Sequence, residues 1–599
     1  MTRQDPSLSR HIEASANSGG SARLPVRDAN GRPDGGAPPP TSAYSVREAP
    51  LGAPKHIRII TIGAGASGIN LIRTLRNTLP AGTFEHVVYE KNKDVGGTWH
   101  ENRYPGCRCD VPSHNYQFSW RKNPEWSNFF APAAEIQAYL CRICDDEDMR
   151  SVIKTSHTVR GARWDEDEAV WHIEVTDLAT GNIIEDKAHF LIDASGILNN
   201  WKWPDVPGLQ DFEGDLVHTA AWPKNFDYKN RTVAVIGNGA SGVQLLPAIR
   251  PDVKKLYHII RSPTAILPPR LATMKAGAFA PLLEKIELDA QENFTPEQIA
   301  RFKSDPAFYE TFTSALELDS NIKFVIALMK DSPQQKWASG KVREFMTAML
   351  RGDEKLCSQL IPNYPLGCRR MTPAPGYLES FQDPRVELTS KAIKSATKSG
   401  LVLEDGEVLE VDAIICATGF DSSFRPVYPL VGRKGNLQDI WARETPKSYI
   451  SLAVDGCPNY FKFLGPNAPI AHGAVFTLSE HIATYIANLI AKAQSEGIRS
   501  VVPSTAAVDD YAAHVASFMP RTAFTGECSS WYKQDGAVTG LHPGSRMHFI
   551  EMLAQFRGED WDFTYDDAEG GSRRPNRFAY LGNGFTVTEV GMMKKAGIS

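Results

Sequence analysis

The stretch IRIITIGAGASGIN, residues 57–70, decides the fold of the chain. Four of its first six residues are isoleucine, and a short β-branched run of this kind is typical of a buried strand in a parallel sheet. The glycines that follow are spaced G-x-G-x-x-G, and the next apolar residues, Ile69, Leu71, Ile72 and Leu75, recur at helical intervals. The stretch therefore predicts a strand, a tight glycine turn and a helix.

A second stretch, TVAVIGNGASG at residues 232–242, repeats this pattern. In such turns the first glycine allows the sharp bend, the second lets the backbone approach a pyrophosphate, and the third lets the helix pack closely on the strand. Two turns in this setting predict an α/β fold with two Rossmann-type dinucleotide-binding domains, with ordinary tight loops as the alternative. The candidate cofactor-binding glycines are Gly63, Gly65, Gly68, Gly237, Gly239 and Gly242.

The residue that ends the next strand differs between the two units. After the first turn the strand HVVY ends at Glu90, whose carboxylate can bind both hydroxyls of an unphosphorylated ribose, as FAD or NAD requires. After the second turn the strand LYHII ends at Arg261 and Ser262, where a cation would pair with the 2′-phosphate of NADPH. The two sites are therefore predicted to bind FAD and NADPH. Solvated strand ends are the alternative explanation of Glu90 and Arg261.

Changes in composition along the chain predict its organisation. Residues 1–50 contain 5 Gly, 7 Pro and 7 Ser, a composition that cannot bury enough apolar surface to offset the entropy of ordering. Between about 270 and 360 the strand pattern gives way to apolar residues at helical spacing. The predicted parts are a disordered leader at 1–55, a first part of the FAD-binding domain at 56–210, an NADP-binding domain with the helical insertion at 211–400, a return part of the FAD-binding domain at 401–565 and a C-terminal tail at 566–599.

Composition and charge exclude several classes of protein. The 599 residues are 42% apolar and 23% charged, which is close to the globular average, and no apolar run reaches the length of a membrane span. With 65 Lys and Arg against 70 Asp and Glu the net charge is −5, which argues against nucleic acid as a partner. No feature indicates an obligate protein partner.

The cysteines favour free thiols. Nine cysteines in this length are sparse and odd in number, which suits the reducing cytoplasm better than a secreted disulfide scaffold. Cys107 and Cys109 lack the usual spacing of a redox pair, and Cys141 and Cys144 form a C-x-x-C without a second pair to complete a zinc site. All four are interpreted as packing residues, and no metal site is predicted.

Between the two glycine turns the sequence resembles a known family. FEGDLVHTAAWP, residues 212–223, is similar to the FxGxxxHxxxWP fingerprint of type I Baeyer-Villiger monooxygenases, which are flavoproteins. Related flavin N- and S-monooxygenases usually carry another aromatic residue in place of Trp222. The matching fingerprint residues are Phe212, Gly214, His218, Trp222 and Pro223.

Other segments resemble the same family between about residues 56 and 560. GGTWHENRYPGCRCD, residues 96–110, is similar to its flavin-contacting stretch, and GCRR, residues 367–370, to its GCKR turn. By this resemblance Arg370 is the catalytic cation, Asp110 is its partner, and Arg369 stands where lysine is usual. The resemblance also implies that the flavin contacts Thr98, Trp99, Asp110, Val111 and Tyr116, and that NADP contacts Arg108, Arg369 and Trp531.

The resemblance implies an activity. This activity is the NADPH- and O2-dependent oxygenation of a small-molecule ketone to an ester or lactone through a flavin C4a-peroxide, which Arg370 would stabilise while Asp110 holds Arg370. Relatives of this type often serve secondary metabolism, so a bulky ketone is the expected substrate. Two alternatives stay open: a flavin-dependent N- or S-monooxygenase, and an NADPH-dependent flavoprotein reductase or oxidase that does not oxygenate.

Overall fold

The first predicted strand–turn–helix unit is present in the computed structural model. β1 (Ile57–Ile62) leads through the glycine turn into α1 (Ala66–Thr78), and β2 (Phe84–Tyr89) returns parallel to β1. Gly63 has a φ of +100°, and a Cβ on Gly68 would lie 2.1 Å from the Gly63 carbonyl oxygen, so both positions require glycine. The structure describes residues 46–269, 274, 279–289, 291–470, 473–566 and 576–598.

A five-stranded parallel sheet surrounds β1. β3 (Ile153–Lys154) lies beyond β2, and β7 (Phe190–Asp193) and β20 (Tyr460–Lys462) lie on the other side of β1. The buried Asp193 carboxylate accepts hydrogen bonds from Lys462 Nζ at 2.6 Å and from the Tyr460 hydroxyl at 3.0 Å. The sheet is therefore completed by a strand that lies 267 residues after the end of β7.

The second predicted unit forms its own five-stranded parallel sheet. β9 (Thr232–Ile236) leads into α4 (Ala240–Ile249), and β10 (Lys255–Ile259) pairs with β9. The other strands are β13 (Val386–Thr389) beside β10, β17 (Ala413–Cys416) beside β9, and β8 (Asp215–His218) at the far edge. The predicted boundary at residue 401 is wrong, because β17 is fully buried between β9 and β8 and belongs to this sheet.

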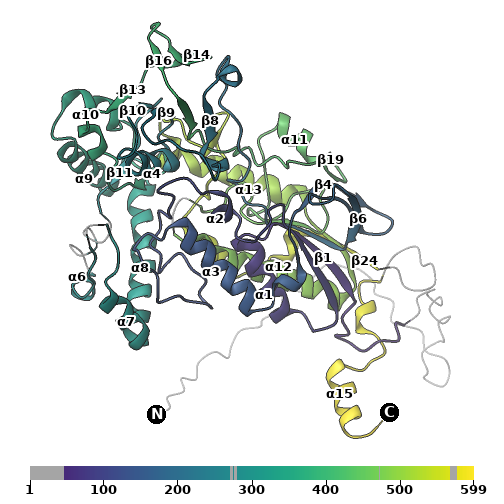
Figure 1. The fold of residues 1–599 in the computed structure, drawn as a ribbon. Coiled ribbons are helices and arrows are strands. Elements are labelled where there is room, and N and C mark those ends of the chain that lie inside the picture. The colour runs from purple at the N-terminus through teal and green to yellow at the C-terminus, as the bar shows by residue number, and fades with distance from the viewer. Residues whose placement is uncertain are drawn as a thin grey trace, which may run out of the picture.

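A mostly antiparallel sheet, absent from the prediction, packs beside the first sheet. Its strands are β4 (His157–Asp165), β5 (Val170–Asp177), β6 (Ile183–Ala188), β18 (Leu430–Gly432) and β19 (Gly435–Asn436). Of its strand pairs, only β18 and β4 run in parallel. Three further strands, β14 (Ile393–Thr397), β15 (Gly400–Leu403) and β16 (Val408–Glu410), form a meander at the top of Figure 1. The short pairs are β11 (Ile266–Leu267) with β12 (Thr372–Pro373), β21 (Ile498–Pro503) with β24 (Trp561–Tyr565), and β22 (Lys533–Gln534) with β23 (Ala537–Val538).

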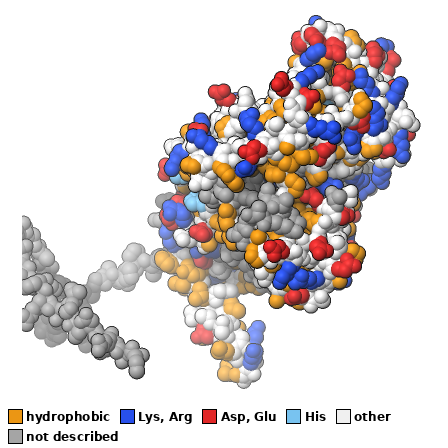
Figure 2. Space-filling model, turned by 90° about the vertical axis from the view of Figure 1, so that its left-hand side faces the viewer, with side chains coloured by type: hydrophobic (Ala, Val, Ile, Leu, Met, Phe, Trp, Pro, Cys, Tyr) orange, Lys and Arg blue, Asp and Glu red, His pale blue; other side chains and the backbone are white. Residues whose placement is uncertain are grey.

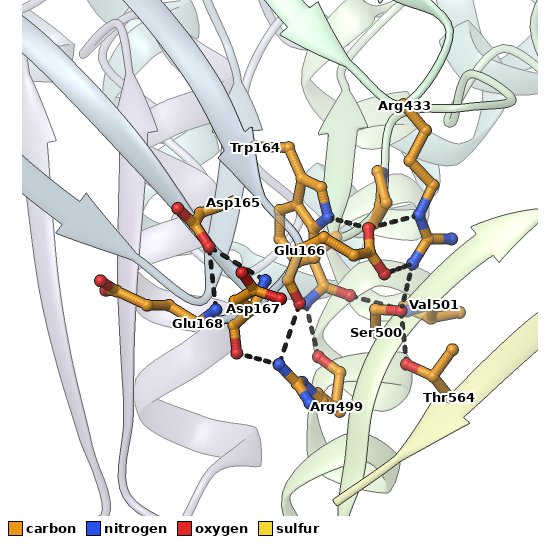
Figure 3. A network of polar contacts seen from close by, with 12 residues as sticks. Trp164, Asp165, Glu166, Asp167, Glu168, Arg433, Arg499, Ser500, Val501 and Thr564 are labelled. Atoms are coloured by element: carbon orange, nitrogen blue, oxygen red, sulfur yellow. Dashed lines mark hydrogen bonds and ion pairs between the residues drawn. The ribbon is translucent and has the colours of Figure 1, made fainter.

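A polar network ties the antiparallel sheet to the C-terminal strands (Figure 3). Glu166 lies in the turn between β4 and β5, and its carboxylate accepts two hydrogen bonds from Arg433, at 2.7 and 2.6 Å. Arg433 also donates to the Ser500 hydroxyl at 3.2 Å, and Ser500 bonds with Thr564 at 2.6 Å. The network therefore holds the β4–β5 hairpin against β21 and β24.

The segment predicted as a helical insertion at about 270–360 contains five helices within its described residues, α6 to α10. Pro296 and Pro306 open two of its helices, after Thr295 and Asp305, whose side chains cap the free backbone N–H groups. The helices α6 to α8 lie at the left of Figure 1, far from β1. The bounds are α6 (Ala280–Leu283), α7 (Pro296–Ser304), α8 (Pro306–Leu328), α9 (Pro333–Met349) and α10 (Glu354–Leu360).

The remaining helices surround the first sheet and the C-terminal segment. α12 runs through the centre of Figure 1 and packs against α1, and its buried face includes Phe476, Ile482 and Ile486. The bounds are α2 (Thr98–Glu101), α3 (Ala133–Asp146), α11 (Leu437–Arg443), α12 (Val475–Glu496), α13 (Thr505–Phe518), α14 (Arg546–Leu553) and α15 (Val587–Lys595).

The two ends of the described chain meet. The leader predicted as disordered at 1–55 lies outside the described residues as far as residue 45. From residue 46 the prediction is wrong, because the Leu51 amide donates to the Phe585 carbonyl at 2.7 Å and Leu51 forms a parallel bridge with Thr586. Composition does not reveal a backbone pairing with the opposite end of the chain. α15 follows this bridge and projects below the body of the molecule (Figure 1).

One pair of cysteines is linked by a disulfide bond. Cys368 and Cys528 form a disulfide across 160 residues of sequence, so the expectation of free thiols throughout is wrong for these two. The odd total does not exclude a pair, because seven cysteines remain free beside it, including Cys107, Cys109, Cys141 and Cys144.

Charged side chains are mixed over the surface. Figure 2 shows Lys and Arg interspersed with Asp and Glu over the described part of one face. Among the described residues, no helix combines the length and the apolar character that a membrane span needs.

Candidate active site

A cavity of about 1200 Å³ reaches both glycine turns. Gly63 and Gly65 line it at the first turn, and Gly237 and Gly239 at the second, each turn lying just before the N-terminus of α1 or α4. At both turns the third glycine lies outside the cavity wall, and a Cβ on Gly242 would lie 2.0 Å from the Gly237 carbonyl oxygen. The first two glycines of each turn therefore face a ligand site, while the third permits helix packing.

Glu90 lies at the end of β2 and lines the cavity. One carboxylate oxygen accepts a hydrogen bond from the Ala64 amide at 2.7 Å, and the other accepts one from the Asn92 amide at 2.8 Å. Burial raises the pKa of Glu90, and the two backbone amides oppose this shift. The Asn92 side-chain amide also donates to Oε1, at 2.8 Å, so Oε2 is the oxygen with a further lone pair that can accept from a ribose hydroxyl.

Basic side chains gather at the second glycine turn. Arg369 donates to the Ser262 hydroxyl at 3.0 Å and to Asn238 Oδ1 at 3.2 Å, and Asn238 is part of the turn itself. Arg261 donates to the Ser529 hydroxyl at 2.5 Å. Two guanidinium groups and two hydroxyls thus meet at the end of β10, where they suit a phosphate group.

Arg370 and Asp110 form a two-point ion pair in the cavity wall. Arg370 Nε donates to one Asp110 oxygen at 2.7 Å and Nη2 to the other at 2.6 Å. The side chains of Arg370 and Asp110 are 24% and 14% exposed. Burial lowers the pKa of Arg370, but the charge of Asp110, its hydrogen bonds and smaller contributions from Tyr532 and Cys109 together raise it by more, so the guanidinium stays charged. Its Nη1 donates to the Ile470 carbonyl at 3.3 Å.

Tyr532 is a site residue to which the sequence analysis assigned no role. It is 1% exposed, and it lies close enough to Arg370 for the charge of the guanidinium to act on the pKa of its hydroxyl. Burial raises the pKa of Tyr532 and the charge of Arg370 opposes this shift, so the phenol is neutral near pH 7. Its neighbour Trp531 lines the cavity, as do Ser529 and Ser530. The family resemblance predicted Trp531 as a nucleotide contact, but nothing in the sequence around Tyr532 indicates that this residue lies beside Arg370.

The residues predicted to contact the flavin line the same cavity. Trp99 and Tyr116 pack edge to face, with ring centroids 5.4 Å apart, and Tyr116 packs in turn on Phe476 of α12. The edge-to-face rings of Trp99 and Tyr116 make part of the cavity wall apolar. The cavity-lining residues of this set are Thr98, Trp99, Asp110, Val111 and Tyr116, and Arg108, which was predicted to contact NADP, lines the cavity as well.

Gln244 on α4 connects the flavin-contacting stretch to the second unit. Its Oε1 accepts from the Tyr104 hydroxyl at 2.8 Å, and its Nε2 donates to the Arg108 carbonyl at 3.0 Å. Sequence analysis missed Gln244, since a glutamine inside a helix carries no distinctive signal.

The fingerprint residues lie outside the wall of this cavity. His218 ends β8, stacks on Trp201 at 4.6 Å, and lies 3.3 Å from the Thr418 hydroxyl. Burial lowers the pKa of His218 to about 4, so the ring is neutral near pH 7. Trp222 packs against Phe226, with ring centroids 5.2 Å apart.

The rest of the fingerprint is also placed by packing. Phe212 is 8% exposed, and a Cβ on Gly214 would lie 2.5 Å from the Phe212 ring and 2.6 Å from the Asp412 carbonyl oxygen. The Phe226 amide donates to the Pro223 carbonyl at 3.4 Å in the turn after Trp222. The fingerprint residues therefore lie in the segment that contains β8, the edge strand of the second sheet, and they pack against that sheet.

The comparisons with known proteins agree with this geometry. Residues 61–133 match the family model of the NAD(P)-binding Rossmann-like domain. The chain is 35% identical over 542 residues to the FAD-binding monooxygenase tazF of Aspergillus terreus, covering 90% of this chain and 93% of the relative. It is 30% identical over 506 residues to a Baeyer-Villiger monooxygenase of Streptomyces coelicolor, covering 83% and 90%. The chain belongs to the Baeyer-Villiger monooxygenase family.

Solved structures support the same family. The closed crystal structure of cyclohexanone monooxygenase aligns with a TM-score of 0.71 at 25% identity, covering 86% of this chain and 100% of that one. The enzyme from Rhodococcus sp. Phi1 bound to NADP+ aligns with the same values. This Baeyer-Villiger family member is an FAD-dependent NADPH monooxygenase. The glycine turns fit two dinucleotides, because Gly65 and Gly239 present bare backbone to the cavity.

Proposed function

We propose that this monooxygenase inserts one oxygen atom of O2 beside the carbonyl of a bulky small-molecule ketone and forms an ester or lactone. The observation that carries the proposal is the Arg370–Asp110 pair in the wall of the cavity between the two glycine turns. When bound, FAD supplies the chemistry that activates O2 with electrons from NADPH.

Arg370 provides fixed positive charge where the reaction needs it. Attack of an anionic oxygen nucleophile on a carbonyl moves negative charge onto the carbonyl oxygen. A guanidinium that donates two hydrogen bonds to Asp110 and one to the Ile470 carbonyl is fixed in orientation, so its charge is preorganised. A single preorganised donor of this kind typically lowers a barrier by about 3 to 4 kcal/mol.

Asp110 positions Arg370 and balances its charge. Without Asp110 the buried guanidinium would be an uncompensated charge, which is strongly unfavourable. The pair also leaves Nη1 of Arg370 near the cavity, where its carbonyl partner, Ile470, is itself a lining residue. We therefore assign substrate binding to the part of the cavity that Arg370 and Ile470 line side by side.

The second site holds the nucleotide that supplies the electrons. Arg261, Ser262 and Arg369 would bind the 2′-phosphate of NADPH, and Trp531 would cover the nucleotide and exclude water. The proposal also places the enzyme in the cytoplasm, without an obligate protein partner. Its support is a composition with few cysteines, seven of which are free.

Arg370→Ala tests the proposal. The purified variant is expected to bind FAD and oxidise NADPH but to lose ester formation about 100-fold or more, since one charged donor is removed. The measurement is ester yield by mass spectrometry over a panel of ketones, beside NADPH consumption and O2 uptake. Arg370→Lys is the matched variant, which keeps the charge, loses the two-point geometry and should retain part of the activity.

Parallel reactions with amines and sulfides separate the related activities. Oxygenated amines or sulfides without esters would contradict the ketone proposal in favour of N- or S-oxygenation. Release of one hydrogen peroxide per NADPH with every substrate would identify an oxidase instead. Undiminished ester formation by Arg370→Ala would remove Arg370 from the reaction.

A further inference from the structure

The disulfide between Cys368 and Cys528 joins two segments that carry site residues. Cys368 directly precedes Arg369 and Arg370, and Cys528 directly precedes Ser529. The pair lies outside the two sheets, in loops that are 160 residues apart in sequence, and the Cα atoms are 6.2 Å apart. The bond therefore links the loop that carries Arg370, the active-site cation, to residues 528–532. We call residues 528–532 the clasp.

The clasp contacts both sites. Ser529 accepts a hydrogen bond from Arg261 at the second glycine turn, and the buried Tyr532 lies close enough to Arg370 for the two groups to shift each other's pKa. Trp531, between these residues, lines the cavity. A bond that fixes the clasp therefore also fixes the contact of Arg261 at the nucleotide site, the position of Trp531 in the cavity wall and the surroundings of Arg370.

The two sulfur atoms differ in access. Cys368 is 0% exposed, whereas Cys528 is partly exposed and lies next to the exposed Glu527 and Ser529. Cys528 is therefore the side from which a thiolate in solution would approach the disulfide, and attack on its sulfur expels Cys368 as the leaving thiolate.

A lysine lies beside the predicted leaving group. Lys533 Nζ is 3.5 Å from Cys368 Sγ and 3.7 Å from Cys528 Sγ. The ammonium also donates to the Cys528 carbonyl at 3.2 Å, so it is held at the bond. A nearby cation stabilises a thiolate and makes it a better leaving group.

We propose that Cys368–Cys528 is a reversible thiol–disulfide site, opened by thiols and closed by hydrogen peroxide, whose state sets how firmly the clasp retains NADP+. Opening consumes two external thiols, which form one external disulfide and leave Cys368 and Cys528 as thiols. Closing converts the two thiols and one hydrogen peroxide into the disulfide and two waters. The inference rests on the NADP site of the proposed function.

The oxidant, hydrogen peroxide, is a by-product of flavin monooxygenases when NADPH is oxidised without oxygenation of the substrate. With the clasp loose, water enters the cavity and more NADPH is spent on hydrogen peroxide. That peroxide would restore the disulfide and tighten the clasp again. The site would thereby limit wasteful oxidation of NADPH.

Differential alkylation of the holoenzyme tests whether the bond exists and opens. Protein is treated with iodoacetamide before or after dithiothreitol, digested and examined by mass spectrometry. The expected result is a linked peptide pair before reduction and alkylation of Cys368 and Cys528 only after it, whereas Cys357, a free and partly exposed cysteine on α10, is alkylated in both samples. Alkylation of both residues without reduction would overturn the proposal.

Cys528→Ser and Cys357→Ser form a matched pair for the functional readout. Reduction of the wild type is expected to weaken NADP+ binding about tenfold, since the clasp must then be ordered on binding, and to raise the hydrogen peroxide released per NADPH. Cys528→Ser should match the reduced wild type and no longer respond to dithiothreitol, while Cys357→Ser should behave as the wild type. An NADP+ affinity that is insensitive to reduction would overturn the proposal.

The readouts separate this inference from the proposed function. NADP+ affinity and the alkylation pattern need no ketone, so a protein that forms no ester can still show the redox-dependent clasp. Ester formation with a redox-insensitive NADP+ affinity would retain the function and overturn the clasp.

Lys533→Gln tests the leaving-group argument. The variant is expected to slow the opening of the disulfide by dithiothreitol about tenfold, and Lys533→Arg should restore the rate. Equal rates in all three proteins would overturn the role of Lys533.

Discussion

The two nucleotide sites are built from different amounts of the chain. At the first site, the Glu90 carboxylate is held by the amides of Ala64 and Asn92, all within one strand–helix–strand unit. At the second, Arg261 and Arg369 rely on Ser262, Asn238 and Ser529, which come from three separate segments. The first site is therefore a local product of its sequence, and the second is assembled from distant loops. Changes in those loops should alter NADPH binding without loss of FAD.

Alanine at the third glycine of each turn should have the largest effect. A Cβ at Gly68 or Gly242 would lie 2.1 or 2.0 Å from a backbone carbonyl oxygen, so each change should cost about 3 to 5 kcal/mol of folding free energy. Gly68→Ala should lose FAD, whereas Gly242→Ala should lose NADP+ binding first. Thermal unfolding and flavin absorbance measure the two outcomes. Equal loss of FAD in both variants would break the contrast between the sites.

Gly239→Ala should separate ligand binding from folding. A Cβ on Gly239 meets no atom within 4 Å, so the protein should fold and retain FAD. The methyl group would stand where the pyrophosphate approaches the backbone, and NADP+ affinity should fall about 100-fold. The matched control is Gly340→Ala on α9, which also meets no atom within 4 Å. Unchanged NADP+ affinity by titration would show that this turn does not bind the nucleotide.

Neutralising one of the two cations should reduce the preference for NADPH over NADH. Arg261→Ala and Arg369→Ala should each lower the ratio of kcat/KM values about tenfold, because one of the two guanidinium groups at the 2′-phosphate is lost. The ratio should also fall with rising salt in the wild type. Steady-state kinetics with both nucleotides measure the effect. A ratio that stays at the parent value would assign these arginines to packing.

Glu90 should produce the smallest effect, seen in the pH dependence of stability. Because burial raises its pKa, the folded FAD-free protein holds a proton that the unfolded chain has already lost. Stability should therefore fall as the pH rises from the ordinary glutamate range through the raised pKa. Glu90→Gln should flatten this part of the profile, as measured by urea unfolding of the FAD-free protein. A wild-type profile as flat as that of the variant would contradict the raised pKa.

Short-range patterns predicted the two units and the helical insertion. In IRIITIGAGASGIN the strand, the turn and the helix are consecutive, so 14 residues contain all the information needed. β17 reads as a strand as well, but its buried partners β9 and β8 come from earlier in the chain, and the sequence alone did not reveal them. The boundary at 401 failed for this reason.

Residues that act through distant contacts were missed. Tyr532 lies beside Arg370, Gln244 accepts a hydrogen bond from Tyr104, and Cys528 pairs with Cys368, and in each case the two partners lie far apart along the chain. A tyrosine, a glutamine and a cysteine are all common packing residues. Their roles depend on where the backbone brings them, which residue type and spacing do not specify.

The late arrival of β20 affects how the protein is made. β20, which pairs with β7, is translated 267 residues after it. At about 5 to 20 residues per second, translation of this stretch takes roughly 13 to 53 s. During that interval the edge of β7 is open, and an unpaired apolar edge can recruit a strand from another nascent chain. Slower elongation between β7 and β20 would lengthen this exposure and lower the yield of protein from the ribosome.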